Sequence, residues 1–115
     1  MPVSFESLNA DFAVAPQLDP AHMAELAAAG FRSVINNRPD LEGGASQPAS
    51  DSMAQAAAAA GLEYAYLPVI PSDIKQDEVA AMAALIARLP KPVLAFCRSG
   101  ARAAKLYQLA GGQTR

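Results

Sequence analysis

Four short runs with the character of strands alternate along the 115 residues with segments of helical periodicity. The runs cover 12–15, 31–36, 62–69 and 92–96, and the helical segments cover 19–30, 51–61, 77–89 and 103–110. This alternation predicts an α/β fold in which parallel strands are joined by right-handed helical crossovers. The run "PVLAF" at 92–96 has no polar residue, so we expect a central strand that is covered on both faces. We therefore predict one domain over 1–115, with a mostly parallel sheet of four to five strands and helices on both faces.

Local signals refine the ends of these elements. The segment "VSF" at 3–5 is expected to pair with 12–15 across a polar turn. Asp19 is a suitable N-cap for the first helix, and Ser50 or Asp51 for the second, because short polar side chains accept bonds from free amide groups at a helix start.

Composition and charge exclude several classes of function. The net charge is −2 and the nine Lys and Arg residues form no long run, which argues against a nucleic-acid partner. One cysteine and one histidine exclude an internal disulfide and the usual Cys/His zinc sites, and we expect no metal or other cofactor. The N-terminus resembles no signal peptide and no apolar run approaches membrane-spanning length. These observations predict a cytoplasmic protein with a reduced thiol and no membrane partner.

The single cysteine, Cys97, follows the central apolar run directly. In parallel sheets, ligands bind beyond the carboxyl ends of the strands. A strand that turns straight into a helix also aims several amide groups at one point, which favours an anion and a thiolate there. We predict that Cys97 is a nucleophile and that the following loop forms an anion cradle. The residues of this cradle are Arg98, Ser99, Gly100, Ala101 and Arg102.

Two resemblances follow from these motifs. "CRSGAR" with its Ala-rich helix resembles the active-site loop of rhodanese-type sulfurtransferases, in which the cysteine carries a persulfide. The segment 12–43, "FAVAPQLDPAHMAELAAAGFRSVINNRPDLEG", resembles the opening of dual-specificity phosphatase-like domains. Over residues 10–110 the chain is similar to the bacterial beta-lactamase-hydrolase-like family, to which both activities have been ascribed. The resemblance implies a protein tyrosine phosphatase-like three-layer sandwich.

Loop length favours the sulfurtransferase interpretation. The resemblance to cysteine phosphatases implies five residues between cysteine and arginine, whereas four separate Cys97 from Arg102. Phe96 and Ala103 stand where those enzymes tend to carry histidine and a hydroxyl residue. We therefore predict a sulfurtransferase: Cys97 takes sulfane sulfur from thiosulfate or a persulfide, and Arg102 with the loop amides holds the terminal sulfur. Arg98 would attract this small anionic donor.

Two alternatives stay open. The first is a cysteine-dependent phosphatase that acts on phosphate esters, with Asp73, on the loop before 77–89, as its general acid. Against this role, Ser72 or Asp73 is expected to cap the following helix. The second alternative is a non-catalytic anion-binding or redox-sensing module, which the reactivity of Cys97 with an alkylating probe would distinguish. The sequence makes no prediction of the oligomeric state.

A second group of polar residues follows the strand at 31–36. Arg38 and Asp40 are expected either to line the rim of the cleft or to form a loop contact, from Arg38 to Asp40 or Glu42. Tyr64 and Tyr66 are two residues apart on a strand, so their side chains are expected on the same face.

Overall fold

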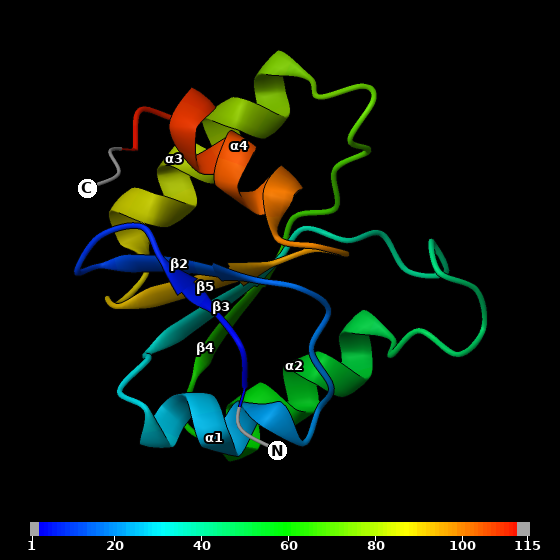
Figure 1. Ribbon diagram of the computed structural model, residues 1–115, viewed down its shortest axis with the longest axis vertical. Coiled ribbons are helices and arrows are strands. Elements are labelled where there is room, and N and C mark those ends of the chain that lie inside the picture. Colours follow the sequence, from blue (N-terminus) through cyan, green and yellow to red (C-terminus); the bar gives the residue numbers. More distant parts are fainter. Residues whose placement is uncertain (1–2, 113–115) are drawn as a thin grey trace.

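One five-stranded sheet organises the molecule (Figure 1). The computed structural model describes residues 3–112. The strands are β1 (Glu6–Ser7), β2 (Phe12–Ala15), β3 (Ser33–Asn36), β4 (Glu63–Tyr66) and β5 (Val93–Phe96), in the order β1-β2-β5-β3-β4. The helices are α1 (His22–Ala28), α2 (Ser50–Ala59), α3 (Gln76–Arg88) and α4 (Ala101–Leu109). β1 is antiparallel to β2 and the other pairings are parallel, so the predicted α/β fold is confirmed.

The strand β5 is central, as its composition predicts. It pairs with β2 on one side and β3 on the other, and all four of its residues are buried. Val93 and Ala95 pack in the cluster that includes residues of α3 and α4, whereas Leu94 and Phe96 pack in the cluster that includes residues of α1 and α2. Figure 1 shows these helix pairs on opposite faces of the sheet. Because strand side chains alternate, Cys97 belongs to the α3 and α4 face.

The N-terminal strand lies later than predicted. The structure places β1 at Glu6–Ser7 and not at 3–5, with Glu6 opposite Val14. The turn explains the shift: the Asp11 amide donates to the Asn9 side-chain oxygen at 2.8 Å, so the chain reverses tightly and the residues next to the turn pair first. The prediction that an N-terminal strand pairs with 12–15 is thus confirmed, but the strand is Glu6–Ser7 and not 3–5.

The predicted helix caps are also corrected. Neither α1 nor α2 has a side-chain cap at its N-cap residue. The Asp19 amide instead donates to Nδ1 of His22 at 2.9 Å. At α2, the Ser50 amide donates to the carboxylate of Asp40 at 2.8 Å. The carboxylate of Asp40, ten residues before α2, therefore accepts the hydrogen bond at the helix start that Ser50 or Asp51 was expected to accept.

The carboxyl ends of the four parallel strands meet at one edge of the sheet. The loops 16–21, 37–49, 67–75 and 97–100 leave the sheet from this edge. Segments that are far apart in the sequence therefore converge around Cys97. Among the helices of residues 3–112, none combines the length and hydrophobicity needed to cross a membrane.

Candidate active site

Cys97 lies on the floor of an open hollow. Its side chain is 1 % exposed, and its backbone amide bonds the Ala15 carbonyl at 3.4 Å. The hollow has a volume of about 300 Å³. Its walls come from the cysteine loop, from α4 and from the loop 67–75: Cys97, Arg98, Ser99, Ala101, Arg102, Lys105, Pro71 and Ile74. We call this space the cysteine hollow. Arg98, Ser99, Ala101 and Lys105 in its walls are exposed, so the hollow opens to solvent above the buried Cys97.

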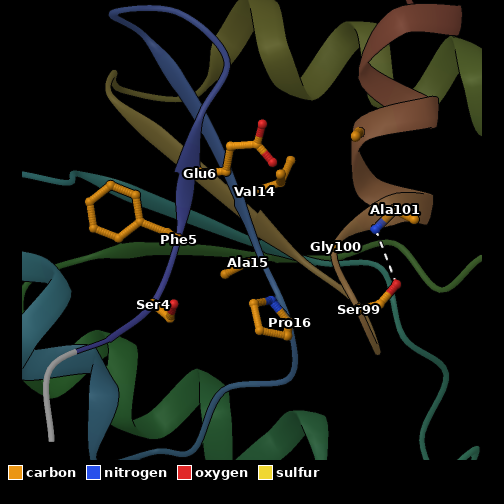
Figure 2. A pocket seen from close by; sticks show the side chains of 10 residues that line it. Ser4, Phe5, Glu6, Val14, Ala15, Pro16, Ser99, Gly100 and Ala101 are labelled. Carbon is orange, nitrogen blue, oxygen red and sulfur yellow. Dashed lines mark hydrogen bonds between the residues drawn. The ribbon is translucent and has the colours of Figure 1, made fainter.

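The loop after Cys97 needs a glycine at position 100. Gly100 has a φ of 97°, in the left-handed region that residues with a Cβ rarely adopt. A Cβ at this position would lie 3.4 Å from the backbone of Ala15, an ordinary contact distance, so the positive φ is the reason for the glycine; Figure 2 shows the two residues side by side. With this geometry the Gly100 amide donates a hydrogen bond to Sγ of Cys97 at 3.1 Å. Such a bond is stronger when the sulfur is a thiolate.

Further amide groups face the start of α4. The Ala101 amide donates to Oγ of Ser99 at 3.3 Å, as Figure 2 shows. The amides of Arg98 and Ser99 have no hydrogen-bond acceptor within residues 3–112. The start of α4 adds the partial positive charge of a helix N-terminus. Loop and helix together are therefore suited to an anion above the sulfur.

Arg102 is buried and connects α4 to two other loops. Its Nη1 donates to Oε2 of Glu42 at 3.1 Å, and its Nη2 donates to Oε1 of the same carboxylate at 3.0 Å. Nη1 also contacts the carbonyl oxygens of Asn37 at 3.3 Å and Val69 at 3.1 Å. The terminal nitrogens are thus already bonded within the protein. Nε, in contrast, is a buried donor without a partner in the described part of the chain.

Glu42 lies between two arginines. Its Oε1 accepts a bond from Nε of Arg38 at 2.9 Å, which confirms one of the two predicted contacts of Arg38. Nη1 of Arg38 donates to the Gln17 side chain at 3.1 Å. A Cβ on Gly43 would lie 2.6 Å from Nη2 of Arg38, so a larger residue there would displace this guanidinium. The loop 37–49 is held to the site by this pair of arginines.

The two arginines determine the charge state of Glu42. Burial raises the pKa of its carboxyl, but the hydrogen bonds and positive charges of Arg102 and Arg38 outweigh burial and hold the pKa below the ordinary glutamate value. The folded state therefore binds a proton at Glu42 less readily than the unfolded chain does. The stabilisation from the carboxylate is present above the ordinary pKa, and it is lost as the pH falls through the lowered pKa of the folded state.

This linkage predicts a pH-dependent difference between the wild type and Glu42→Gln. At neutral pH the variant is expected to unfold at a lower temperature, because two buried guanidinium groups lose their anionic partner. This difference in melting temperature should narrow as the pH falls below the ordinary glutamate pKa, because the wild-type carboxyl then becomes neutral, as the amide of the variant already is. Thermal melts followed by circular dichroism between pH 7 and pH 3 measure this gap. A gap that stays constant over the whole range contradicts the assignment.

A hydroxyl network supports the same loop from the other side. The Asn36 side chain donates to the Tyr64 hydroxyl at 3.0 Å, and the hydroxyls of Tyr64 and Ser50 share a bond of 2.8 Å. The Asp40 amide donates to the Tyr66 hydroxyl at 2.9 Å. Burial raises the pKa of Tyr64, and its hydrogen bonds offset this only in part. Tyr64 therefore connects the end of β3 with the start of α2, and Tyr66 holds the loop 37–49 between them. Asp40 contacts α2 and not Arg38.

Asp73 lies beside the cysteine hollow without lining it. Its neighbours Pro71 and Ile74 line the hollow, whereas its own side chain is 66 % exposed and lies 4.0 Å from Nζ of Lys75. The N-cap of α3 is Lys75, whose amide donates to the Glu78 carboxylate at 2.8 Å. The expectation that Ser72 or Asp73 caps this helix was therefore wrong.

Two residues of the site escaped the sequence analysis in part or in full. Glu42 was expected to contact Arg38, four residues before it, but its bond to Arg102 joins residues 60 apart and has no signal in the sequence. Lys105 was not considered, although on α4 it lies three residues after Arg102 and so on the same helical face.

Comparisons with known proteins agree on one family. Residues 4–114 match the family described as beta-lactamase hydrolase-like protein, phosphatase-like domain. The beta-lactamase hydrolase-like protein of Xylella fastidiosa strain Temecula1 is 38% identical over 102 residues, and that of Agrobacterium fabrum is 37% identical. Each alignment covers 89% of this chain and 23% of the relative. The chain thus spans less than a quarter of the length of these curated relatives.

Solved structures point the same way. A phosphatase candidate from Neisseria meningitidis Z2491 is 34% identical, with a TM-score of 0.81 over 89% of this chain and 72% of that one. A second, from Shewanella putrefaciens CN-32, is 25% identical, with a TM-score of 0.78 over 95% and 70% of the two chains. The catalytic core of the yeast PP-IP phosphatase SIW14 has a TM-score of 0.66 at 11% identity, and it supports the fold alone.

These findings overturn the sulfurtransferase prediction. It depended on a short loop and on the likeness to rhodanese, which none of these comparisons supports, whereas residues 4–114 match a phosphatase-like family and most of the chain aligns with phosphatase-like structures. The physical error was to infer the size of the bound group from the number of loop residues. The hollow is also walled by Pro71, Ile74 and Lys105 from other elements, and its volume suits a small ester. The chain belongs to the family of phosphatase-like domains of beta-lactamase hydrolase-like proteins.

Proposed function

We propose that this chain is a cysteine-dependent phosphatase that hydrolyses phosphate monoesters. One observation carries the proposal: the single thiol and the unpartnered, buried Nε–H of Arg102 belong to residues that line the same hollow. Within residues 3–112, no acidic residue lines this hollow, and Arg98 and Lys105 add positive charge to its walls. A phosphate dianion is the ligand that this arrangement favours.

The first chemical step forms a phosphocysteine. The Cys97 thiolate attacks phosphorus, the S–P bond forms, and the P–O bond to the leaving group breaks. The non-bridging oxygens accept hydrogen bonds from the loop amides and from Nε of Arg102, which are already in place before the reaction. We assign the proton that the leaving oxygen takes up to the carboxylic acid of Asp73.

The second step regenerates the enzyme. A water molecule attacks the phosphocysteine, the Asp73 carboxylate accepts its proton, and the S–P bond breaks. Inorganic phosphate leaves, and Cys97 returns as a thiolate, which the Gly100 amide stabilises. Neither step involves oxidation or reduction. The direct test of the proposal is therefore the release of inorganic phosphate from an aryl phosphate.

The role of Asp73 predicts a dependence on the leaving group. In Asp73→Asn, kcat for an alkyl phosphate is expected to fall about a hundredfold, because an alkoxide leaves poorly without a proton. With nitrophenyl phosphate the fall should be much smaller, since nitrophenolate is stable as an anion. Asp77→Asn, an exposed substitution on α3, is the matched control and should change neither rate. An equal loss with both substrates removes Asp73 from this role.

A further inference from the structure

A second hollow adjoins the cysteine hollow along α4. The second hollow has a volume of about 430 Å³, and it shares Pro71, Ile74 and Lys105 with the first. Apolar contacts in it come from Ile74, Val79 and Leu109. A molecule whose phosphate lies above Cys97 can therefore extend between the loop 67–75 and α4. We call this second space the lysine hollow.

The lysine hollow is suited to a second negative charge. Lys105 is exposed and forms no ion pair or side-chain hydrogen bond in the described part of the chain. Ser72 and Gln76 add further hydrogen-bond donors to the lining. No acidic residue lines the hollow within residues 3–112, although the whole chain has a net charge of −2. An uncompensated ammonium group beside polar donors attracts an anion.

On the other side of the cysteine hollow, towards β1, the wall carries a negative charge and not a positive one. A third hollow of about 380 Å³ lies between β1, β2 and α4, and it shares Ser99 and Ala101 with the cysteine hollow. Figure 2 shows Glu6 and Val14 in its wall, and none of its described lining residues is a cation. A negatively charged group that left the cysteine hollow this way would meet the Glu6 carboxylate. Charge thus selects the side of Lys105 over the side of Glu6.

We infer that the substrate is a phosphate monoester that carries a second anionic group, a carboxylate or a phosphate, beyond a short apolar stretch. The apolar stretch contacts Ile74, Val79 and Leu109, and the second anion binds Lys105 with help from Ser72 and Gln76. Lys105 is thus a residue that determines specificity. This inference rests on the proposed phosphatase function for the placement of the first phosphate above Cys97.

Binding of two matched ligands to the Cys97→Ser protein tests the inference without turnover. The ligands are hexyl phosphate and its ω-carboxylate analogue, which differ only in the terminal anion. Isothermal titration calorimetry is expected to give a Kd about tenfold lower for the carboxylate analogue, the effect of one charge-assisted hydrogen bond. Adding Lys105→Gln should bring the two Kd values together, and Lys105→Arg should keep part of the preference. Glu6→Gln is the control that should leave the preference unchanged.

Each outcome supports or overturns the inference separately from the phosphatase proposal. A preference for the carboxylate analogue that survives Lys105→Gln, or that changes with Glu6→Gln, overturns the assignment of the lysine hollow. Equal binding of the two ligands, or no binding of either, overturns it too. Release of phosphate from both compounds by the wild type, with no preference, leaves the phosphatase proposal intact and contradicts the second subsite. A Lys105-dependent preference without any phosphate release supports the subsite and contradicts the phosphatase.

Discussion

Cys97→Ser is expected to lower phosphate release from an aryl phosphate by at least about a thousandfold, the scale that removal of a nucleophile has in other covalent enzymes. The serine hydroxyl is close in size to the thiol but is a far weaker nucleophile at neutral pH, because almost none of it is ionised. The substitution removes neither the Gly100 amide nor Arg102, so binding of phosphate should persist. Malachite-green detection of phosphate, with a Kd from calorimetry, separates the two effects.

Alkylation gives an independent measurement of the same thiol. Because Cys97 is the single cysteine, one iodoacetamide adduct in the mass spectrum reports on this site alone. We expect the adduct to abolish phosphate release and inorganic phosphate to slow its formation. A Cys97→Ser protein that releases phosphate at the wild-type rate, with an unchanged melting temperature, would assign any observed activity to another residue.

The fold could be predicted because its signals are local. The four residues of β5 are all apolar, so both faces of this strand have to be covered. A central position in the sheet provides that cover. The position of Cys97 directly after that strand was then sufficient to place the thiol at the carboxyl edge of the sheet. Local reasoning failed at the caps, where Asp40 binds the start of α2 from ten residues away.

The activity could not be predicted from the cysteine loop alone. The sequence shows how many residues lie between Cys97 and Arg102, but it does not show that Pro71 and Ile74 complete the wall. Nor does it show that Glu42 occupies both terminal nitrogens of Arg102. These features depend on contacts between distant segments, and they determine which group the hollow can hold. The role of Cys97 as a nucleophile therefore stays a prediction from the motif, whereas the sulfurtransferase interpretation of the same motif was wrong.

Arg102→Lys is the second substitution with a large expected effect, because it acts on the fold and on the site together. A lysine retains the charge but cannot form the two-pronged bond to Glu42, reach the Val69 carbonyl and present an Nε–H at the same time. We expect a loss of about 2 kcal/mol in the free energy of unfolding, because buried acceptors lose their donor. The value of kcat/KM should fall about a hundredfold, the typical cost of one lost transition-state donor.

Two further variants separate these contributions to the effect of Arg102→Lys. Arg32→Lys, at an exposed position before β3 and so away from the carboxyl edge, is the matched control and should alter neither stability nor rate. Glu42→Gln should lower stability but retain more of the rate, since it leaves Nε of Arg102 in place. When Arg102→Lys and Glu42→Gln are combined, their losses in the free energy of unfolding should be less than additive, because both substitutions remove the same contact. Full additivity would show that Arg102 stabilises the fold without Glu42, and an unchanged kcat/KM in Arg102→Lys would remove its Nε from the phosphate site.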